Sequence, residues 1–320
     1  MENDKSYKVE LLSPAGSLEC VKVAIDAGAD AVYMGGSKFS ARAFAKSASE
    51  DSILEAIKFV KSANKKFYLT ITTLFKQKEL KEIFVYLDPM VEAGVDAFII
   101  YDLGVAKLLK EKYKNVELHA STQMMTTSSK AIKLLKSLGF SQVVLSRELG
   151  LKEIKEIKKE VKDEIKLETF IHGSMCYCYS GACLMSSFIG GESGNRGRCK
   201  GPCRLEYVPN GANKNYKEKY LLSMKDMCAI SALKQLMDIG VYCFKIEGRM
   251  RKPEYVREVT KIYRKYIDAI TNGTYDSDIK KKIIDFKSDE RKLLDAYNKG
   301  GFANYYDNHN SESMIQRFQR

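Results

Sequence analysis

The chain reads Ala27-Gly28-Ala29-Asp30-Ala31-Val32-Tyr33-Met34 near its start, and this stretch contains the pattern that indicates the fold. A glycine ends an amphipathic stretch, two residues follow, and a short apolar run begins. Glycine adopts the left-handed conformation that closes a helix, and a short β-branched or aromatic run is typical of a buried strand. The pattern recurs around Gly94, Gly139 and Gly240, so the sequence repeats a helix-to-strand unit.

Further strand candidates lie between these units and bring the expected number to eight. In chain order the expected strands are Val9–Ser13, Ala31–Met34, Phe67–Thr73, Ala97–Tyr101, Glu117–Ser121, Gln142–Leu145, Leu167–Ile171 and Cys243–Ile246. Helical segments such as Ser52–Ala63 and Ser129–Ser137 alternate with them. Eight βα units over roughly 250 residues match a TIM barrel, although a doubly wound sheet gives a similar alternation. We predict an α/β protein with a TIM-barrel-like (β/α)8 fold.

Two regions depart from the alternation. A segment rich in Cys, Gly, Asn and Ser follows the seventh strand, and we expect a functional insertion there because long loops in compact domains usually carry function. The lysine-rich C-terminal part is expected to form helices outside the barrel. The predicted organisation is a barrel domain over residues 1–272 that includes a cysteine-rich insertion over 174–215, followed by a basic helical tail over 273–320.

Composition points to a globular protein with a basic surface. The 320 residues are 45% apolar, and 53 Lys and Arg against 41 Asp and Glu give a formal net charge of +12. The apolar runs are far shorter than the roughly 20 residues of a membrane helix, and the first residues lack the apolar core of a signal peptide. We therefore expect a cytoplasmic protein with no membrane segment. The positive surplus is typical of proteins that bind polyanions such as nucleic acid.

The cysteines are concentrated in the insertion. Five of the eight lie between Cys176 and Cys203, and in a reducing compartment such a cluster is more often metal-binding or catalytic than disulfide-bonded. Only Cys199 and Cys203 have the spacing of a zinc-binding pair. Four thiolates at irregular spacing suit an iron–sulfur cluster at least as well, and Cys228 could add a ligand from a following loop. Cys20 and Cys243 are expected to be small buried side chains.

The segment from Glu168 to Ser186 contains Glu168, an aromatic residue, His172-Gly-Ser-Met-Cys176, and then Gly181-Ala-Cys183-Leu-Met-Ser186. This pattern resembles the signature of the U-32 peptidase family, the collagenase-like group. Further motifs similar to those of the family follow one another along nearly the whole chain. They are Leu12–Ser17, Ala29–Gly36, Asp102–Gly104, His119–Met124, Ser146–Glu148, Asn195–Cys199 and Lys245–Met250.

The resemblance implies more than one activity. The family was named for collagenase-like proteolysis, yet its members include proteins that hydroxylate tRNA wobble uridine or ribosomal RNA, with prephenate linked to the hydroxyl donor. Other members hydroxylate ubiquinone without oxygen and hold a four-iron four-sulfur cluster. By this resemblance the cluster ligands would be Cys176, Cys183, Cys199 and Cys228, with Cys203 as the alternative fourth ligand.

The residues themselves argue poorly for a peptidase. The chain has no His-Glu-x-x-His zinc motif and no Gly-x-Ser-x-Gly nucleophile elbow. His119 and His172 are expected near the carboxyl ends of the fifth and seventh strands, which form the catalytic rim of a TIM barrel. A dyad of His172 with Cys176 or Ser174 therefore keeps hydrolysis open as an alternative.

Polar residues at the strand ends define the predicted site. The predicted catalytic residues are His172, Glu168, His119, Glu247 and Arg147. The residues predicted to bind an acidic small molecule are Arg42, Gln123, Arg196, Lys245 and Arg249. Arginine suits this role because its guanidinium pairs with a carboxylate through two hydrogen bonds. The basic stretches Arg196–Arg204 and Lys245–Lys265 are expected to contact RNA.

Three functions remain in view. The preferred prediction is an iron–sulfur-dependent RNA hydroxylation enzyme of the tRNA wobble-uridine type, with prephenate as co-substrate and tRNA as partner. The alternative is a collagenase-like peptidase. The third is a non-catalytic subunit of a heteromeric hydroxylase, so both a homo-oligomer and a hetero-oligomer stay open.

Overall fold

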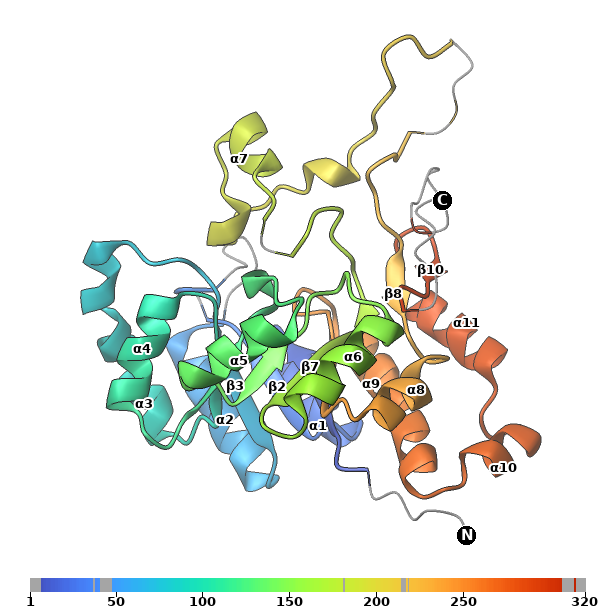
Figure 1. Cartoon of the computed structure of the whole chain (residues 1–320), viewed down its shortest axis with the longest axis horizontal. Coiled ribbons are helices and arrows are strands. Elements are labelled where there is room, and N and C mark those ends of the chain that lie inside the picture. The colour runs from blue at the N-terminus through green and yellow to red at the C-terminus, as the bar shows by residue number, and fades with distance from the viewer. Residues whose placement is uncertain are drawn as a thin grey trace.

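A closed barrel of parallel strands forms the centre of the protein (Figure 1). The computed structural model describes residues 7–36, 38–40, 48–180, 182–213, 217, 219–306 and 314. The barrel strands within this part of the chain are β1 (Glu10–Ala15), β2 (Ala31–Met34), β3 (Lys66–Ile71), β4 (Ala97–Ile100), β5 (Glu117–Ala120), β6 (Gln142–Val144), β7 (Lys166–Gly173) and β9 (Cys243–Ile246).

The pairing of β9 distinguishes a barrel from an open sheet. β9 pairs in parallel with β1, where Leu12 faces Lys245, and also with β7, where Glu168 faces Cys243. The sheet therefore closes on itself, which confirms the TIM-barrel-like prediction and rules out the doubly wound alternative. Each expected strand is present, with ends that differ by at most two residues.

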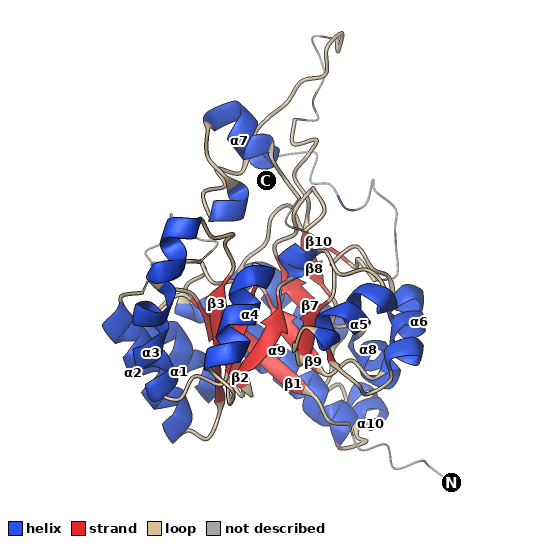
Figure 2. Ribbon diagram, turned by 60° about the vertical axis from the view of Figure 1, so that its left-hand side comes forward, coloured by secondary structure: helices blue, strands red, loops and turns tan. Residues whose placement is uncertain are grey.

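Helices surround the strands, as Figure 2 shows. Those that follow the barrel strands are α1 (Leu18–Asp26), α2 (Glu50–Ser62), α3 (Ile83–Glu92), α4 (Leu103–Lys112), α5 (Ser129–Ser137), α6 (Leu151–Val161), α8 (Leu233–Ile239) and α9 (Pro253–Thr271). Their apolar faces pack with the outward side chains of the strands in one continuous core. A second apolar cluster, which includes Leu12, Tyr68 and Ile99, fills the barrel interior. No helix of the described residues is both long and apolar enough to cross a membrane.

The four glycines of the repeated pattern have left-handed backbone conformations. The φ angles of Gly28, Gly94, Gly139 and Gly240 lie between 91° and 96°. Each glycine ends a helix and lets the chain turn into the next strand, because a side chain is strained at such angles. The four glycines of the pattern that predicted the fold therefore have the left-handed backbone conformation expected of them.

The insertion follows β7, the seventh strand of the barrel, as predicted. It contains α7 (Met185–Gly190) and two 3-10 helices, η3 (Gly194–Arg196) and η4 (Pro202–Arg204), and it stands beyond the carboxyl ends of the strands in both views (Figures 1 and 2). The chain returns through β8 (Asp226–Cys228), which runs antiparallel to β7.

The C-terminal part adds helices outside the barrel, as expected. α10 (Tyr275–Lys280) and α11 (Phe286–Ala296) lie against α9. A short strand that the sequence did not predict, β10 (Phe302–Ala303), pairs with β8. The chain beyond α11 therefore returns to the end of the barrel that carries the insertion.

Replacing Gly94 with alanine tests the helix-ending pattern. A Cβ atom at this position would lie 3.7 Å from the nearest described atom, on Lys61, so the change adds backbone strain without a clash. We expect Gly94→Ala to lower the free energy of unfolding by about 1–2 kcal/mol in urea denaturation. Gly190→Ala is the control, because Gly190 has no positive φ and open space around it. Equal stability of the two variants would contradict the interpretation.

Candidate functional site

A buried ion pair lies inside the barrel between two neighbouring strands. Nζ of Lys245 on β9 is 2.7 Å from Oε1 of Glu168 on β7, and the two side chains are 5% and 0% exposed. The side-chain amide of Gln142 on β6 donates to the second carboxylate oxygen of Glu168. The Lys245 ammonium also lies 4.4 Å from the centre of the Tyr33 ring, which stabilises a cation. Glu168, a predicted catalytic residue, and Lys245, a predicted binding residue, therefore form an ion pair with each other.

Arg249, just after β9, is held at the carboxyl end of the barrel. Its guanidinium donates to Thr70 Oγ1 at 2.8 Å and to Ser40 Oγ at 3.0 Å. A Cβ atom on Gly35 would lie 2.7 Å from Nη1 of this guanidinium, closer than a normal contact. The glycine after β2 therefore leaves the space that the Arg249 side chain occupies.

Tyr33 and Glu247 complete the polar group at this end of the barrel, which we call the barrel mouth. The Tyr33 hydroxyl donates to the Ile246 carbonyl at 2.8 Å and lies 3.3 Å from Oε2 of Glu247. The Tyr255 hydroxyl donates to the Glu247 carbonyl at 2.8 Å. Oriented cations next to a carboxylate and a phenol can bind an acidic molecule and can move a proton.

Arg147, a predicted catalytic residue, and the predicted binding residues Gln123 and Arg42 do not share these contacts. Arg147, after β6, donates to the Ser174 carbonyl at 3.2 Å and lies 5.3 Å from the centre of the Phe170 ring. Gln123 is half-buried in the 3-10 helix η2 (Thr122–Met124), after β5. Arg42 lies outside the described residues.

The side chain of His172 points away from the barrel mouth. The pairing of β7 with β9 is irregular between Phe170 and His172, so the alternation that turns Phe170 inward is interrupted before His172. The imidazole is 1% exposed and packs against Tyr255 and Tyr263 of α9 and Phe302 of β10. Burial lowers the pKa of His172 to about 3, so its ring is neutral. His172 therefore lies near the carboxyl end of β7, as expected, but its side chain points to α9 and β10 and not into the barrel mouth.

His119 faces the opposite end of the barrel. Its fully buried ring lies 4.7 Å from the Tyr68 ring, and Nε2 is 3.3 Å from Oε2 of Glu117, the first residue of β5. His119 lowers the pKa of Glu117 below its usual range, with help from Ser141 and Lys166. His119 is the third residue of the four-residue strand β5, but its side chain points towards the amino end of the strands and not to the rim.

Five thiols come together in the insertion. Burial and the neighbouring Cys183 thiol raise the pKa of Cys178 to about 11, with smaller effects from Cys176 and Cys203. Burial also raises the pKa of Cys203, which interacts with Cys176, Cys199 and Cys183. Within the described residues, no three His, Cys, Asp or Glu side chains are arranged as ligands of one metal ion. The thiols form a loose group rather than a compact mononuclear site.

Backbone features support this group of thiols. The amide of Gly201 donates to Sγ of Cys199 at 3.3 Å. A Cβ atom on Gly194 would lie 3.6 Å from Cβ of Cys199 and 3.7 Å from the carbonyl oxygen of Cys183. The loop segments that carry Cys183 and Cys199 therefore meet at Gly194.

Cys228 is separate from the five thiols. It lies in β8, 6% exposed, and burial raises its pKa to about 12. The Tyr263 hydroxyl is 4.0 Å from its Sγ atom, and Glu290 of α11 is its charged neighbour. The structure thus brings Cys203, the alternative fourth residue, to the others and leaves Cys228 against α9. Cys20 and Cys243 are buried, as expected.

Arg196 fastens the insertion to the loop after β3. Its guanidinium lies 2.5 and 3.0 Å from the two carboxylate oxygens of Glu79 and also donates to the Leu74 carbonyl. The Arg196 guanidinium lowers the pKa of Glu79 to about 2. The sequence did not single out Glu79, because it is 117 residues from Arg196.

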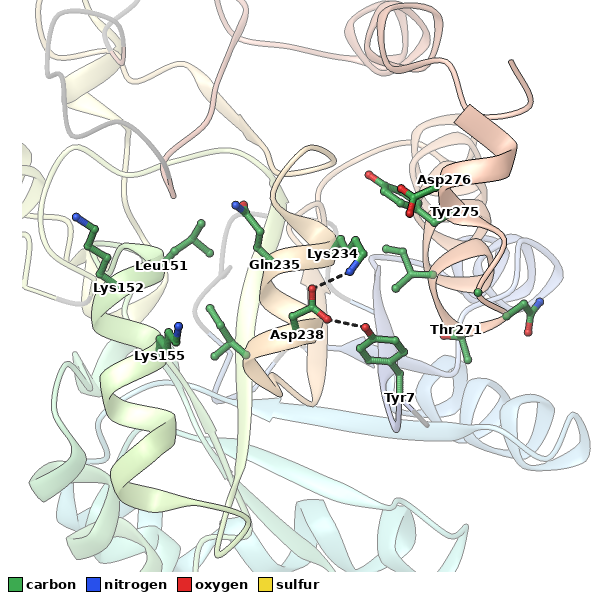
Figure 3. A pocket seen from close by; sticks show the side chains of 14 residues that line it. Tyr7, Leu151, Lys152, Lys155, Lys234, Gln235, Asp238, Thr271, Tyr275 and Asp276 are labelled. Carbon is green, nitrogen blue, oxygen red and sulfur yellow. Dashed lines mark hydrogen bonds and ion pairs between the residues drawn. The ribbon is translucent and has the colours of Figure 1, made fainter. Parts of the chain in front are cut away.

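A groove of about 1130 Å³ lies beside α8, away from the barrel mouth (Figure 3). Asp238 accepts hydrogen bonds there from Tyr7 at 2.6 Å and from Lys234 at 2.8 Å. The residues predicted for chemistry do not line it. The candidate site is therefore the mouth of the barrel beneath the thiols.

This geometry defines a TIM-barrel protein with a thiol-rich insertion at the carboxyl end of its strands. Residues 16–316 match the model of Peptidase family U32. The chain is 39% identical to an uncharacterized protease of Methanocaldococcus jannaschii, over 92% of this chain and 72% of that protein. The chain belongs to peptidase family U32.

Two further relatives are named for RNA modification. The chain is 40% identical to the 23S rRNA 5-hydroxycytidine C2501 synthase of Escherichia coli, over 83% of this chain and 40% of that protein. It is 37% identical to tRNA hydroxylation protein P1 of Bacillus subtilis, over 82% of this chain and 64% of that protein. The solved structure of a U32 peptidase is similar in fold, with a TM-score of 0.52 and 11% identity over 76% of this chain and 94% of that chain.

Removal of one partner of the buried ion pair should be costly. Lys245→Met leaves the Glu168 carboxylate buried without its cation, and we expect the free energy of unfolding to fall by about 3–5 kcal/mol. Lys245→Met combined with Glu168→Gln should recover much of this loss. Lys136→Met is the control, because the Lys136–Glu164 pair is 44% and 47% exposed and solvent-exposed ion pairs contribute little to stability. Equal losses in the buried and exposed variants would contradict this interpretation.

The Arg196–Glu79 pair should hold the insertion in a pH-dependent way. A lowered carboxyl pKa contributes stability above the ordinary value of 4.5, and this stability is lost as the pH falls towards 2. Hydrogen exchange of residues 193–198, corrected for intrinsic rates, should therefore accelerate between these values. Glu79→Gln should exchange faster already at pH 7. Glu192→Gln is the control, because its carboxylate lies 3.8 and 3.9 Å from Arg198 and Lys200; the same effect there would count against a specific role of Glu79.

Proposed function

We propose that this chain is an iron–sulfur-dependent enzyme that hydroxylates a base of RNA, with the wobble uridine of tRNA as the first candidate. The observation that carries the proposal is the position of five thiols in an insertion at the barrel mouth, where the cations and Glu247 lie. The names of the relatives from E. coli and B. subtilis support RNA as the substrate. A cytoplasmic location is part of the proposal, because a reducing compartment keeps thiols available as ligands.

The proposed cluster ligands are Cys176, Cys183, Cys199 and Cys203. Thiolates are the normal ligands of such clusters, and a bound cluster would supply one-electron transfer. The loose spacing of the thiols suits a cluster of several irons better than one ion, because these thiolates would hold a larger group than a single ion. Cys203 is preferred to Cys228 because its electrostatic neighbours are the other thiols, whereas those of Cys228 are Tyr263 and Glu290.

The proposed co-substrate is an acidic hydroxyl donor of the prephenate class. In the overall exchange, a C–H bond of the base and the C–O bond of the donor are replaced by a C–O bond on the base and a C–H bond on the donor. The base is thereby oxidised by two electrons and the donor is reduced by two. Arg249 is oriented by Thr70 and Ser40 and would bind a donor carboxylate, while Glu247 would accept or return a proton at the rim.

The other predicted residues would act indirectly. Lys245 and Glu168 compensate each other inside the barrel and would support the positions of Tyr33 and Arg249. Arg196 would position the insertion through Glu79. The exposed cations Arg198 and Lys200 would steer the RNA backbone.

Proteolysis is the second candidate because one relative is named as a protease. A dyad that uses His172 is disfavoured, since its ring packs against α9 and β10 rather than beside Ser174 or Cys176. The Ser174 hydroxyl instead accepts a hydrogen bond from Arg251 at 2.9 Å.

Cysteine variants test the proposed function directly. The wild type purified without oxygen should contain iron and absorb near about 400 nm, as expected for thiolate-to-iron charge transfer. Cys203→Ser should lose iron and absorbance, whereas Cys228→Ser and the matched control Cys178→Ser should keep both. A colourless wild type that cleaves gelatin would support the peptidase instead.

The reaction is tested by mass spectrometry of nucleosides from tRNA and ribosomal RNA. A strain that lacks the gene should lose one hydroxylated pyrimidine, and the wild-type and Cys228→Ser genes should restore it. Cys203→Ser should fail to restore it. An unchanged nucleoside profile in the deletion strain would contradict RNA hydroxylation.

A further inference from the structure

A second cationic group lies beside the barrel mouth, between the loops that follow β6, β7 and β9. Nη2 of Arg251 donates to the Ser174 hydroxyl at 2.9 Å, and its Cζ lies 3.4 Å from the centre of the Tyr297 ring. Nη1 of Arg147 donates to the carbonyl of the same serine at 3.2 Å. Two guanidinium groups from different loops are thus fixed around Ser174.

Lys299 enters this group from the segment between α11 and β10. Burial, and then Arg204 and Arg251, lower the pKa of Lys299, while Asp226 and Glu247 act in the opposite direction. Among the described residues, no carboxylate lies within 4.0 Å of the Lys299 ammonium and no acceptor is hydrogen-bonded to it. Lys299 is therefore a half-buried cation whose hydrogen-bond donors are unused.

The carboxylates nearby do not balance these cations. Asp226 lies among them, with Lys299, Arg251 and Arg204 as charged neighbours and the Ser174 hydroxyl as a hydrogen-bond donor. It is 1% exposed, burial raises its pKa, and its Oδ1 atom has no hydrogen-bond partner in the described part of the chain. Glu247 already lies against Tyr33. Cations held close together in a partly buried region repel one another, and this repulsion destabilises them unless an anion compensates their charge.

Arg204 has a structural task in this group. Its guanidinium donates to the carbonyl oxygens of Met175 and Met224 and to the Ser223 hydroxyl at 2.8 Å. It thereby joins the beginning of the insertion to its end. The donors that remain for a ligand belong to Arg251 and Lys299, because the Ser174 hydroxyl is hydrogen-bonded to Arg251 and Asp226.

The place of these residues in the fold indicates which anion they suit. TIM barrels frequently bind phosphate with the loops that follow their seventh and eighth strands. Ser174 follows β7, the seventh barrel strand, and Arg251 follows β9, the eighth. A guanidinium fork and an ammonium together match the several oxygens of a phosphate group.

We propose that Arg251 and Lys299 form a phosphate-binding site beside the barrel mouth, with Ser174 positioning Arg251, and that the occupant of this site is a backbone phosphate of the bound RNA. The first half of the proposal, that these residues bind phosphate, does not depend on the reaction. The second half, that the phosphate belongs to RNA, rests on the proposed function. With Arg249 on the other side of the mouth, the site separates the phosphate of one substrate from the carboxylate of the other. Such a separation would orient the target base relative to the hydroxyl donor.

Inorganic phosphate tests the first half with the purified full-length protein. At constant ionic strength set with chloride, phosphate should raise the melting temperature of the wild type in a saturable way. Lys299→Met and Arg251→Met should each weaken this binding about tenfold. Lys287→Met, a change of an exposed lysine on α11, is the control and should behave as the wild type does. Lys299→Arg should retain binding, which shows that charge rather than packing is responsible.

The second half is tested with a tRNA anticodon stem-loop. Lys299→Met should reduce the slope of log affinity against log salt by about 0.7, the value for one lost contact to a single strand. Inorganic phosphate should compete with this RNA for the wild type but not for Lys299→Met. A stem-loop with one uncharged methylphosphonate beside the wobble position should bind the wild type as weakly as the unmodified RNA binds Lys299→Met.

The outcomes separate the two proposals. Saturable phosphate binding that depends on Lys299, in a protein that hydroxylates no RNA, would keep the phosphate site and reject the proposed function. RNA hydroxylation together with equal phosphate and RNA binding by the wild type and Lys299→Met would overturn the site and keep the function. Phosphate binding without a change in salt slope would assign the site to a free phosphate compound rather than to the RNA backbone.

Discussion

β9 forms hydrogen-bonded pairs with β1 on one side and with β7 on the other, and these two ladders close the barrel. Closure satisfies the backbone groups that an open sheet would leave at its edges. It also brings the ends of all eight strands to one mouth, although they are spread over more than two hundred residues. Because β9 is the last barrel strand, Arg249 and Arg251 reach the same end of the molecule as Ser40 and Thr70.

The interior of the closed barrel is polar where it approaches this mouth. Burial of Lys245 and Glu168 is costly for each charge alone, and their contact and the amide of Gln142 offset the cost. The pair joins β7 to β9, the same strands whose pairing completes the barrel. A charged interior of this kind supports oriented side chains above it, which an apolar interior could not hold by hydrogen bonds.

The insertion is held over the mouth by contacts at both of its ends. Arg204 connects Met175 with Met224, β8 pairs with β7, and Arg196 reaches Glu79 on the far side of the mouth. The thiols are therefore kept near the cations of the barrel, even though the loop that carries them contains little regular structure. This arrangement places electron transfer, carboxylate binding and phosphate binding within one enclosed region in the function that we propose.

The sequence by itself determined the order of helices and strands, because helix-ending glycines and buried apolar runs are local signals with a local physical cause. It also identified the family and the thiol-rich segment, since both depend on short motifs. Only the tertiary structure decided which side chains meet. The irregular pairing after Phe170 takes His172 out of the interior, Cys203 rather than Cys228 joins the other thiols, and Glu79 and Lys299 arrive from distant segments. Such contacts depend on how the sheet closes and how the insertion folds back over it, and no local pattern of residues encodes them.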